Sequence, residues 1–242
     1  MVKEDFWYNG VSAKSMGITL REPVVVGGAI PRVERVSVPG RNGDLVYFDG
    51  SYENRPAEAS CFALKARNVM QSITRVNNWL LGDFGYKELV IPEDRDHFFL
   101  ATVENGAEIN TKLAILAPFE IEFSCKPQRF LNIGKKQIEI PGEAIEFKIY
   151  NPTQFESNPL LKIYGTGTLG VSFNGKITNI RDVQEWVYYD CENHNAWKDL
   201  ELFNNNVYGA PLDTRKILPG ENDVHAAGST TKIEIIPRWW EL

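Results

Sequence analysis

Metal-ligating residue types come close together at two places in the sequence. The first is Asp94-x-Asp96-His97, whose oxygen and nitrogen atoms are ligands that divalent metals accept. The second is Cys191-x-x-His194, which amounts to half of a tetrahedral zinc site. Because the chain has only three histidines and no Cys-x-x-Cys pair, further ligands are scarce. We therefore expect a polar turn at the first place, and we assign no metal and no cofactor.

The second half of the chain also carries residue types found in sugar-active proteins. Asp190 with Glu192, or Glu201, could supply the paired carboxylates of a glycosidase, but nothing in the sequence places two of them across one groove. Stacking on a sugar is the other chemistry, and four tryptophans could provide it: Trp186, Trp197, Trp239 and Trp240. Such residues more often fill a sandwich core or an interface.

Other motifs and thiols point away from catalysis. The sequence has no G-x-S-x-G and no P-loop. Gly165-x-Gly167-x-x-Gly170 has the spacing of a dinucleotide-binding loop, but no helix follows, so we expect a hairpin. Cys61 and Cys125 lie in apolar strand-like runs and, with Cys191, are expected to be structural thiols.

Composition sets the broad class. The 242 residues are 43% hydrophobic and 24% charged, and the net charge of −6 does not indicate a basic nucleic-acid surface. There is no run of 18 apolar residues, and the N-terminus lacks a signal-peptide pattern. We expect a non-enzymatic protein that is made and folded in the cytoplasm.

The pattern is β-rich, with one convincing helix. Residues 66–81 carry an apolar stripe at helical spacing, namely Val69, Ile73, Val76 and Leu80, widened by Met70 and Trp79. Phe119–Cys125 alternates strictly and predicts a strand with one buried face. A linker at 126–136 separates an N-terminal domain, 1–130, from a C-terminal domain, 131–242. Short strands between frequent turn signals predict a β-sandwich in the second domain.

A long turn-rich stretch precedes the helix. Residues 39–43, Pro-Gly-Arg-Asn-Gly, form a strong turn signal. A strand is expected at 45–48, a second turn at Asp49-Gly50 and a further strand at 55–64. A β-bulge near Glu34-Arg35 would reconcile the apolar register of the preceding strand.

Ordered short motifs then give a family resemblance. They are Phe6–Gly10, Ser15–Ile18, Val38–Leu45, Gly50–Asn54, Trp79-Leu80 and Phe119–Pro127, followed by Asn151–Thr153, Ser157–Pro159, Asn174-Gly175 and Trp186–Cys191. The first group follows a pattern of a V-P-G-R-x-G turn, a G-x-Y-x-N step, a W-L helix end and an F-x-C-x-P exit strand. Because these motifs occur in this order, the chain resembles the distal tail protein (Dit, phage tail component) family of long non-contractile-tailed bacteriophages. The resemblance covers nearly the whole length of the chain.

The resemblance implies a fold and a set of partners. The fold is mainly β: an N-terminal β-sheet or split-barrel domain with one packed helix, then a galectin-like β-sandwich. Such proteins form a homohexameric ring at the phage or prophage tail tip, between the tail-tube protein and tail-tip, baseplate or receptor-binding proteins. DNA would pass through without specific binding, and the acidic balance suits such a lumen. The implied location is the virion, assembled in the host cytoplasm.

The turn is the candidate interface with a neighbouring subunit or the tail tube: Pro39, Gly40, Arg41, Asn42 and Gly43. A plain solvated turn is the alternative. Some family members carry a carbohydrate-binding insertion, for which this chain has no room. Three other functions stay open: a carbohydrate-binding β-sandwich accessory protein, a β-sandwich glycosidase, and another tail-tip or tail-tube component.

Overall fold

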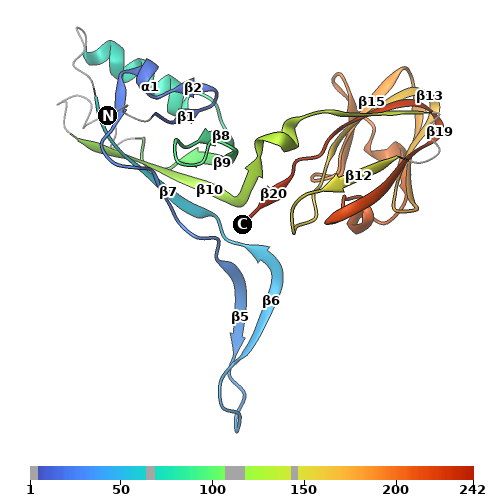
Figure 1. Ribbon diagram of the computed structural model, residues 1–242, viewed down its shortest axis with the longest axis horizontal. Helices are drawn as coiled ribbons and strands as arrows, with labels where there is room; N and C mark the ends of the chain where they lie inside the picture. Colours follow the sequence, from blue (N-terminus) through green and yellow to red (C-terminus); the bar gives the residue numbers. More distant parts are fainter. Residues whose placement is uncertain (1–4, 64–68, 107–117, 143–146) are drawn as a thin grey trace. The chain divides into compact units, whose positions relative to one another are not determined.

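The protein forms two compact β-rich units (Figure 1). The computed structural model describes residues 5–63, 69–106, 118–142 and 147–242. Unit 1 comprises Met1–Arg129 with Leu242, and unit 2 comprises Phe130–Glu241. Each unit has its own cluster of buried apolar side chains, so each is held together by its own core.

Unit 1 is built on an antiparallel sheet with strand order β2-β1-β8-β9-β10-β7-β3, and β4 pairs with β7. The strands are β1 (Trp7–Tyr8), β2 (Val11–Ser12), β3 (Ile18–Leu20), β4 (Val25–Val26), β7 (Arg55–Ala63), β8 (Lys87–Val90), β9 (His97–Val103) and β10 (Phe119–Leu131). The alternation predicted for β10 is present, because Phe119, Ile121 and Phe123 are buried whereas Glu120 and Glu122 are exposed. One face of the sheet therefore packs on the core and the other faces outward.

The helix α1 (Val69–Leu81) packs on this core. It confirms the predicted helix from residue 69 onward, while residues 66–68 lie outside the described residues. Val76 and Leu80 are buried, and the Trp79 indole Nε1 donates a hydrogen bond to the Tyr8 carbonyl oxygen at 2.8 Å. Met70 was expected to widen the buried stripe, but it is 69% exposed. The buried stripe is therefore narrower than predicted.

A two-stranded hairpin extends from unit 1 (Figure 1). Among the strands that the structure describes, β5 (Pro31–Val36) and β6 (Leu45–Tyr52) pair only with each other. The turn predicted at Asp49-Gly50 is wrong, because β6 continues through it. The register changes there instead: Val33 pairs with Phe48 and Pro31 with Tyr52, so the extra residues of β6 form a bulge.

The β-bulge predicted near Glu34-Arg35 is wrong in position, because the observed bulge lies in β6 between Phe48 and Tyr52. These two residues pair regularly with Tyr47 and Val46. Gly50 has φ +88°, a conformation that favours glycine in bulges as well as in turns. Gly50 therefore does adopt the positive φ that the sequence suggests, but in a bulge within β6 and not in a turn.

Unit 2 is a β-sandwich around the second core. Its strands are β11 (Ile138–Pro141), β12 (Lys148–Asn151), β13 (Leu160–Phe173), β14 (Lys176–Val183), β15 (Trp186–Asp190), β16 (Asn195–Lys198), β17 (Glu201–Leu202), β18 (Val207–Gly209) and β19 (Gly220–Ile236), and the short β20 (Trp240–Glu241) ends the chain. The main strand order is β11-β19-β13-β15-β16-β17. β12 pairs with β19, and β14 joins β13 to β18.

The long strands β13 and β19 run through both parts of the sandwich. β13 pairs with β15 over residues 160–164 and with β14 over residues 167–173, while β19 follows its other edge. The change falls at Gly165–Leu169, where the register shifts and Gly167 has φ +99°. The hairpin predicted at this glycine motif is therefore wrong. The glycines provide a bulge, of the kind that lets a strand pass from one layer to another.

Candidate functional site

The hairpin of unit 1 exposes apolar side chains on both of its faces. We call residues 30–53 the arm; its base is closed by a hydrogen bond from the Glu53 amide to the Ile30 carbonyl, 2.8 Å. The cross-strand pairing puts Val33, Val46 and Phe48 on one face, and Val36, Leu45 and Tyr47 on the other. All six are exposed, from 38% for Val33 to 66% for Tyr47.

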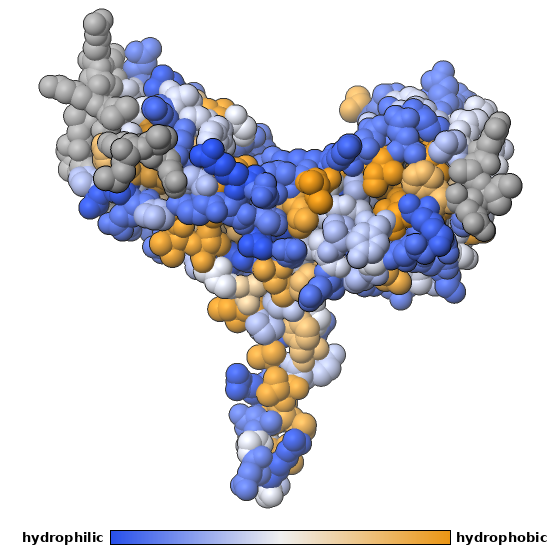
Figure 2. All heavy atoms as spheres, in the orientation of Figure 1, coloured by the Kyte–Doolittle hydropathy of each residue, from blue (hydrophilic) through white to orange (hydrophobic). Residues whose placement is uncertain are grey.

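Such an arm has no core of its own. Figure 2 shows apolar residues along its stem and hydrophilic residues at its tip. An isolated two-stranded hairpin is marginally stable in water. A strand with apolar side chains on both faces is typical of burial on both faces. The arm therefore has the side-chain pattern of a segment that is enclosed by another surface.

The predicted turn, 39–43, forms the tip of the arm. The Arg41 amide donates to the Val38 carbonyl oxygen at 3.1 Å, which closes a four-residue turn. Pro39 occupies its second position and Gly40, with φ +80°, its third, as a type II turn requires. All five residues of the predicted interface are exposed. They lie together, pointing away from the core of unit 1.

Polar side chains fix the arm where it joins the sheet. Asn54 Nδ2 donates to Tyr86 Oη at 2.8 Å and to Ser124 Oγ at 3.0 Å. The Arg55 guanidinium is buried, donates to the Pro127 carbonyl oxygen and lies over the Phe99 ring. Burial lowers the pKa of Arg55. The root of the arm is thus bonded to Tyr86, which directly precedes β8, and to β10.

The outward face of the unit 1 sheet is acidic near this root. Glu58 of β7 and Glu122 of β10 are directly opposite in the antiparallel ladder, and both are exposed. The Glu104 amide bonds the Glu122 carbonyl, which brings a third acidic residue to the same shallow hollow of about 260 Å³. Like charges directly opposite each other destabilise a strand pair. This negative surface therefore has a cost in folding stability.

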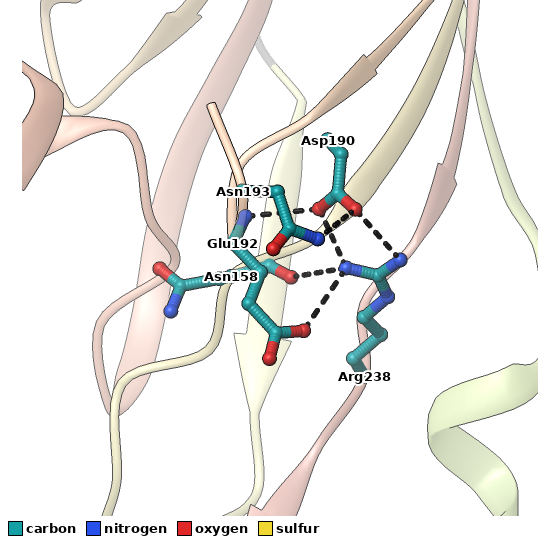
Figure 3. A network of polar contacts seen from close by, with 5 residues as sticks. All are labelled: Asn158, Asp190, Glu192, Asn193 and Arg238. Atoms are coloured by element: carbon teal, nitrogen blue, oxygen red, sulfur yellow. Dashed lines mark hydrogen bonds and ion pairs between the residues drawn. The ribbon is translucent and has the colours of Figure 1, made fainter. Parts of the chain in front are cut away.

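The carboxylates proposed for a glycosidase are engaged in an ion-pair network (Figure 3). Arg238 Nη1 lies 2.7 Å from Asp190 Oδ1 and 3.5 Å from Glu192 Oε2. Asn193 Nδ2 donates to Asp190 Oδ2 at 2.9 Å. Burial alone would raise the pKa of Asp190, but the hydrogen bonds from Arg238 and Asn193 outweigh it and the pKa is lowered. A carboxyl held in its charged form is poorly suited to donate a proton.

The third proposed carboxylate lies elsewhere. Glu201 is exposed on the edge strand β17, which β16 separates from β15, the strand that carries Asp190. It takes no part in the ion-pair network of Asp190. Of the pairings that the sequence left open, the structure therefore brings Asp190 and Glu192 together, both beside Arg238, and leaves Glu201 apart from them.

In the first metal-type motif Asp94 and His97 have other partners, whereas in the second the buried His194 Nδ1 has no hydrogen-bond partner among the described residues. His97 Nδ1 lies 2.6 Å from Asp94 Oδ1, and Asp94 Oδ2 lies 3.4 Å from Arg129 Nη1. Cys191 is buried, and burial raises the pKa of its thiol strongly. Within the described ranges no three His, Cys, Asp or Glu residues are placed to hold a metal ion. Over the same ranges, no helix combines the length and apolarity needed to cross a membrane.

The four tryptophans do not form one platform. Trp239 is buried in the core of unit 2, and Trp240 stacks on Phe155 with ring centroids 4.4 Å apart. Trp186 and Trp197 are half-buried on a different surface, with Tyr188 between them. Trp240 is also half-buried, so the partly exposed tryptophans lie in two separate aromatic groups, Trp240 with Phe155 and Trp186 and Trp197 with Tyr188.

The fold of the chain, with its two β units and hairpin arm, is similar to that of a solved phage protein. One solved structure that shows this likeness is SPP1 Dit (gp 19.1), described as a paradigm of the hub adsorption apparatus in phages that infect Gram-positive bacteria. The match covers 99% of both chains with a TM-score of 0.65 and 11% sequence identity. It confirms the predicted fold class and the predicted resemblance at the level of the fold. No family model and no curated protein matches the sequence.

Proposed function

We propose that the chain is a structural, non-enzymatic component of a phage tail tip, the distal tail hub that joins the tail tube to the host-adsorption apparatus. The observation that carries the proposal is the fold match, which spans both units of this chain and covers 99% of the chain of a hub protein. A match to one unit alone would fit many β proteins equally well. The ion-paired, charged state of Asp190 supports a non-enzymatic role.

The arm is the contact that builds the ring in this proposal. Six copies of the chain would place each arm on the next subunit, so that the apolar residues of both its faces become buried. A head-to-tail contact of this kind closes into a ring when its rotation permits. The exposed apolar stem, the separate two-stranded sheet and the fixed root all support an intermolecular role.

The polar tip then reaches a neighbouring subunit or the tail tube. Arg41 and Asn42 present hydrogen-bonding side chains at the end of a rigid turn, where they would set the register of the contact. The tube and the tail-tip or baseplate proteins are the other partners, on opposite sides of the ring. In this proposal the protein is assembled into the tail in the host cytoplasm and acts in the finished virion.

The acidic hollow supports a channel through which DNA slides. Binding to DNA is driven by neutralisation of phosphates, so a surface that carries Glu58, Glu104 and Glu122 repels the backbone. The strand pair tolerates two opposed carboxylates, which fits a functional reason for keeping them. We place these residues on the channel wall.

Negative-stain imaging of the concentrated protein, with mass measured by light scattering, tests the proposal. We expect rings of six chains with a central hole. Dimers or an open filament would contradict the closed ring. If the free chain stays monomeric, incorporation is measured in assembled particles, where antibody labelling should mark the tail tip. Labelling along the whole tail would instead identify a tube component and refute the hub assignment.

A further inference from the structure

Asparagine stands directly before glycine at four places in the chain, and the structure gives these places different surroundings. They are Asn9-Gly10, Asn42-Gly43, Asn105-Gly106 and Asn174-Gly175. An asparagine in this position can react with its own chain, because glycine has no side chain to hinder the approach of its amide nitrogen to the asparagine side-chain carbonyl carbon. In a folded protein the reaction also depends on the backbone conformation of the asparagine and on whether its side chain is held.

Two of the pairs have a backbone conformation that opposes the reaction. Asn9 and Asn174 have φ of +50° and +48°, each in a two-residue turn between paired strands. In this left-handed conformation the next backbone nitrogen points away from the asparagine side chain. Asn174 is also held by its side chain, because Nδ2 donates to Asn222 Oδ1 at 2.8 Å and Oδ1 accepts from the Asp223 amide at 2.9 Å.

The third pair is held by hydrogen bonds and by close packing. Asn105 Nδ2 donates to the Glu120 carbonyl oxygen at 2.8 Å, and Asn105 Oδ1 accepts from the Glu122 amide at 3.0 Å. A Cβ on Gly106 would collide with the Leu81 side chain, so the chain has little room to move here. Reaction at Asn105 would therefore require that both hydrogen bonds break.

Asn42, at the tip of the arm, lacks these restraints. It is exposed and lies within residues 37–44, which join β5 to β6, and its φ is not positive. Among the described residues, neither the Asn42 side chain nor the Gly43 amide has a hydrogen-bond partner. A Cβ on Gly43 would meet no atom within 4 Å, so the space around this nitrogen is open.

We propose that Asn42 is a site of spontaneous deamidation in the free protein. The Gly43 nitrogen loses its proton to solvent and attacks Asn42 Cγ, so that a new C–N bond closes a five-membered succinimide ring. The bond from Cγ to the side-chain nitrogen breaks, and this nitrogen takes up a proton from solvent and leaves as ammonia. Water then opens the ring. Addition at Cγ gives aspartate, whereas addition at the main-chain carbonyl carbon gives isoaspartate, in which the chain continues through the former side chain.

The product changes the end of the proposed contact between subunits. Aspartate and isoaspartate both carry a negative charge at neutral pH, directly beside Arg41. Isoaspartate also lengthens the main chain by a carbon atom and so alters the turn. If the tip contacts a neighbouring subunit or the tail tube, as proposed above, enclosure protects Asn42, and a subunit that reacts before assembly loses part of its contact. This consequence rests on the proposed function, whereas the reaction in the free chain does not.

Peptide mass spectrometry of the full chain, stored as a monomer in mildly alkaline buffer, tests the proposal. Digestion in heavy-oxygen water marks any conversion that occurs during sample handling. Asn42 should convert at least about tenfold faster than Asn105 and Asn174, because the held sites react only after local opening. In denaturant all three should convert at similar rates, since each precedes glycine. The variant Asn42→Gln should show no conversion at the tip, because glutamine would have to form a larger ring.

Equal rates at the three sites of the native chain would overturn the proposal. So would a native Asn42 that stays intact while the same residue converts in denaturant. The consequence for assembly is measured in a partly converted sample separated into rings and monomers, or into particles and free chains. Converted chains should be at least about threefold enriched in the unassembled fraction, and equal proportions would refute protection by assembly. Absence of every assembly would refute the hub function alone, because the rates in the free chain still decide the deamidation site.

Discussion

Replacing two aromatic residues of the arm should weaken the ring without unfolding the subunit. Tyr47 and Phe48 lie on opposite faces of the arm, and they are 66% and 44% exposed. Full burial of a large apolar side chain is worth about 1.5–3 kcal/mol. Because roughly half of each side chain remains to be buried, the pair would contribute about 2 kcal/mol to each proposed contact between subunits. The variant Tyr47→Ser/Phe48→Ser should therefore weaken each contact about 30-fold.

The subunit itself should be almost unaffected. Neither side chain belongs to either hydrophobic core, and surface substitutions of this kind usually change the free energy of unfolding by less than about 0.5 kcal/mol. Thermal denaturation should show a midpoint within about 2 °C of the parent protein. Sedimentation velocity over a concentration series then reports the oligomer, and negative-stain imaging reports closed rings.

A matched control separates the arm from general surface hydrophobicity. Tyr150 and Tyr208 are 70% and 47% exposed, and both lie on unit 2. Tyr150→Ser/Tyr208→Ser removes a similar exposed area away from the arm, and should leave assembly intact. Equal assembly of the arm variant and the parent protein would refute the intermolecular role of the arm. Equal weakening by the control would show that the arm has no special part in the contact.

Three further outcomes follow from local geometry. Arg238→Met should destabilise unit 2 by about 2 kcal/mol at pH 7, because it leaves the Asp190 carboxylate without its ion-pair partner. The pKa of Asp190 is lowered in the folded protein, so the stability that the ion pair provides is present above about pH 4 and is lost as the pH falls. The melting curves of the variant and the parent protein should therefore converge in acid. Gly40→Ala should cost about 1–2 kcal/mol in the arm turn, because Gly40 has φ +80°, and hydrogen exchange of arm amides should accelerate while unit 1 stays protected. Burial raises the pKa of Cys61 and Cys125 to about 12, so the native protein at pH 8 should not react with a disulfide reagent until it is denatured, and rapid native labelling would contradict their buried placement.

The sequence predicts elements whose signal is local and repeated. The alternation of β10 assigns a face to each side chain because a strand has a period of two, and α1 shows its buried stripe because a helix has a period of 3.6. Glycine signals are less decisive, since Gly50 and Gly167 adopt positive φ in bulges where turns were predicted. Turns and bulges place the same demand on φ, so composition alone does not separate them.

The candidate site was predictable only in part. The tip of the arm follows from its turn chemistry, because Pro39 and Gly40 suit the central positions of one turn type. The pairing of Glu58 with Glu122 depends on strand register, and the ion pair of Asp190 with Arg238 joins residues 48 positions apart. No local pattern encodes such pairs. The apolar run at 45–48 does carry information, because consecutive apolar residues in a strand lie on both of its faces. Such a strand is typical of burial on both faces.

The arm must also avoid indiscriminate pairing, since its outer edges are exposed strands. Natural proteins limit such pairing with charges, bulges and short strands. β5 carries Arg32, Glu34 and Arg35 among its apolar residues, and the bulge at Gly50 interrupts β6. These features disfavour stacking of identical flat edges. They leave the apolar faces, and not the edges, as the attractive surface. A neighbouring subunit in the proposed closed ring would enclose the arm from both faces, which water around a monomer does not do.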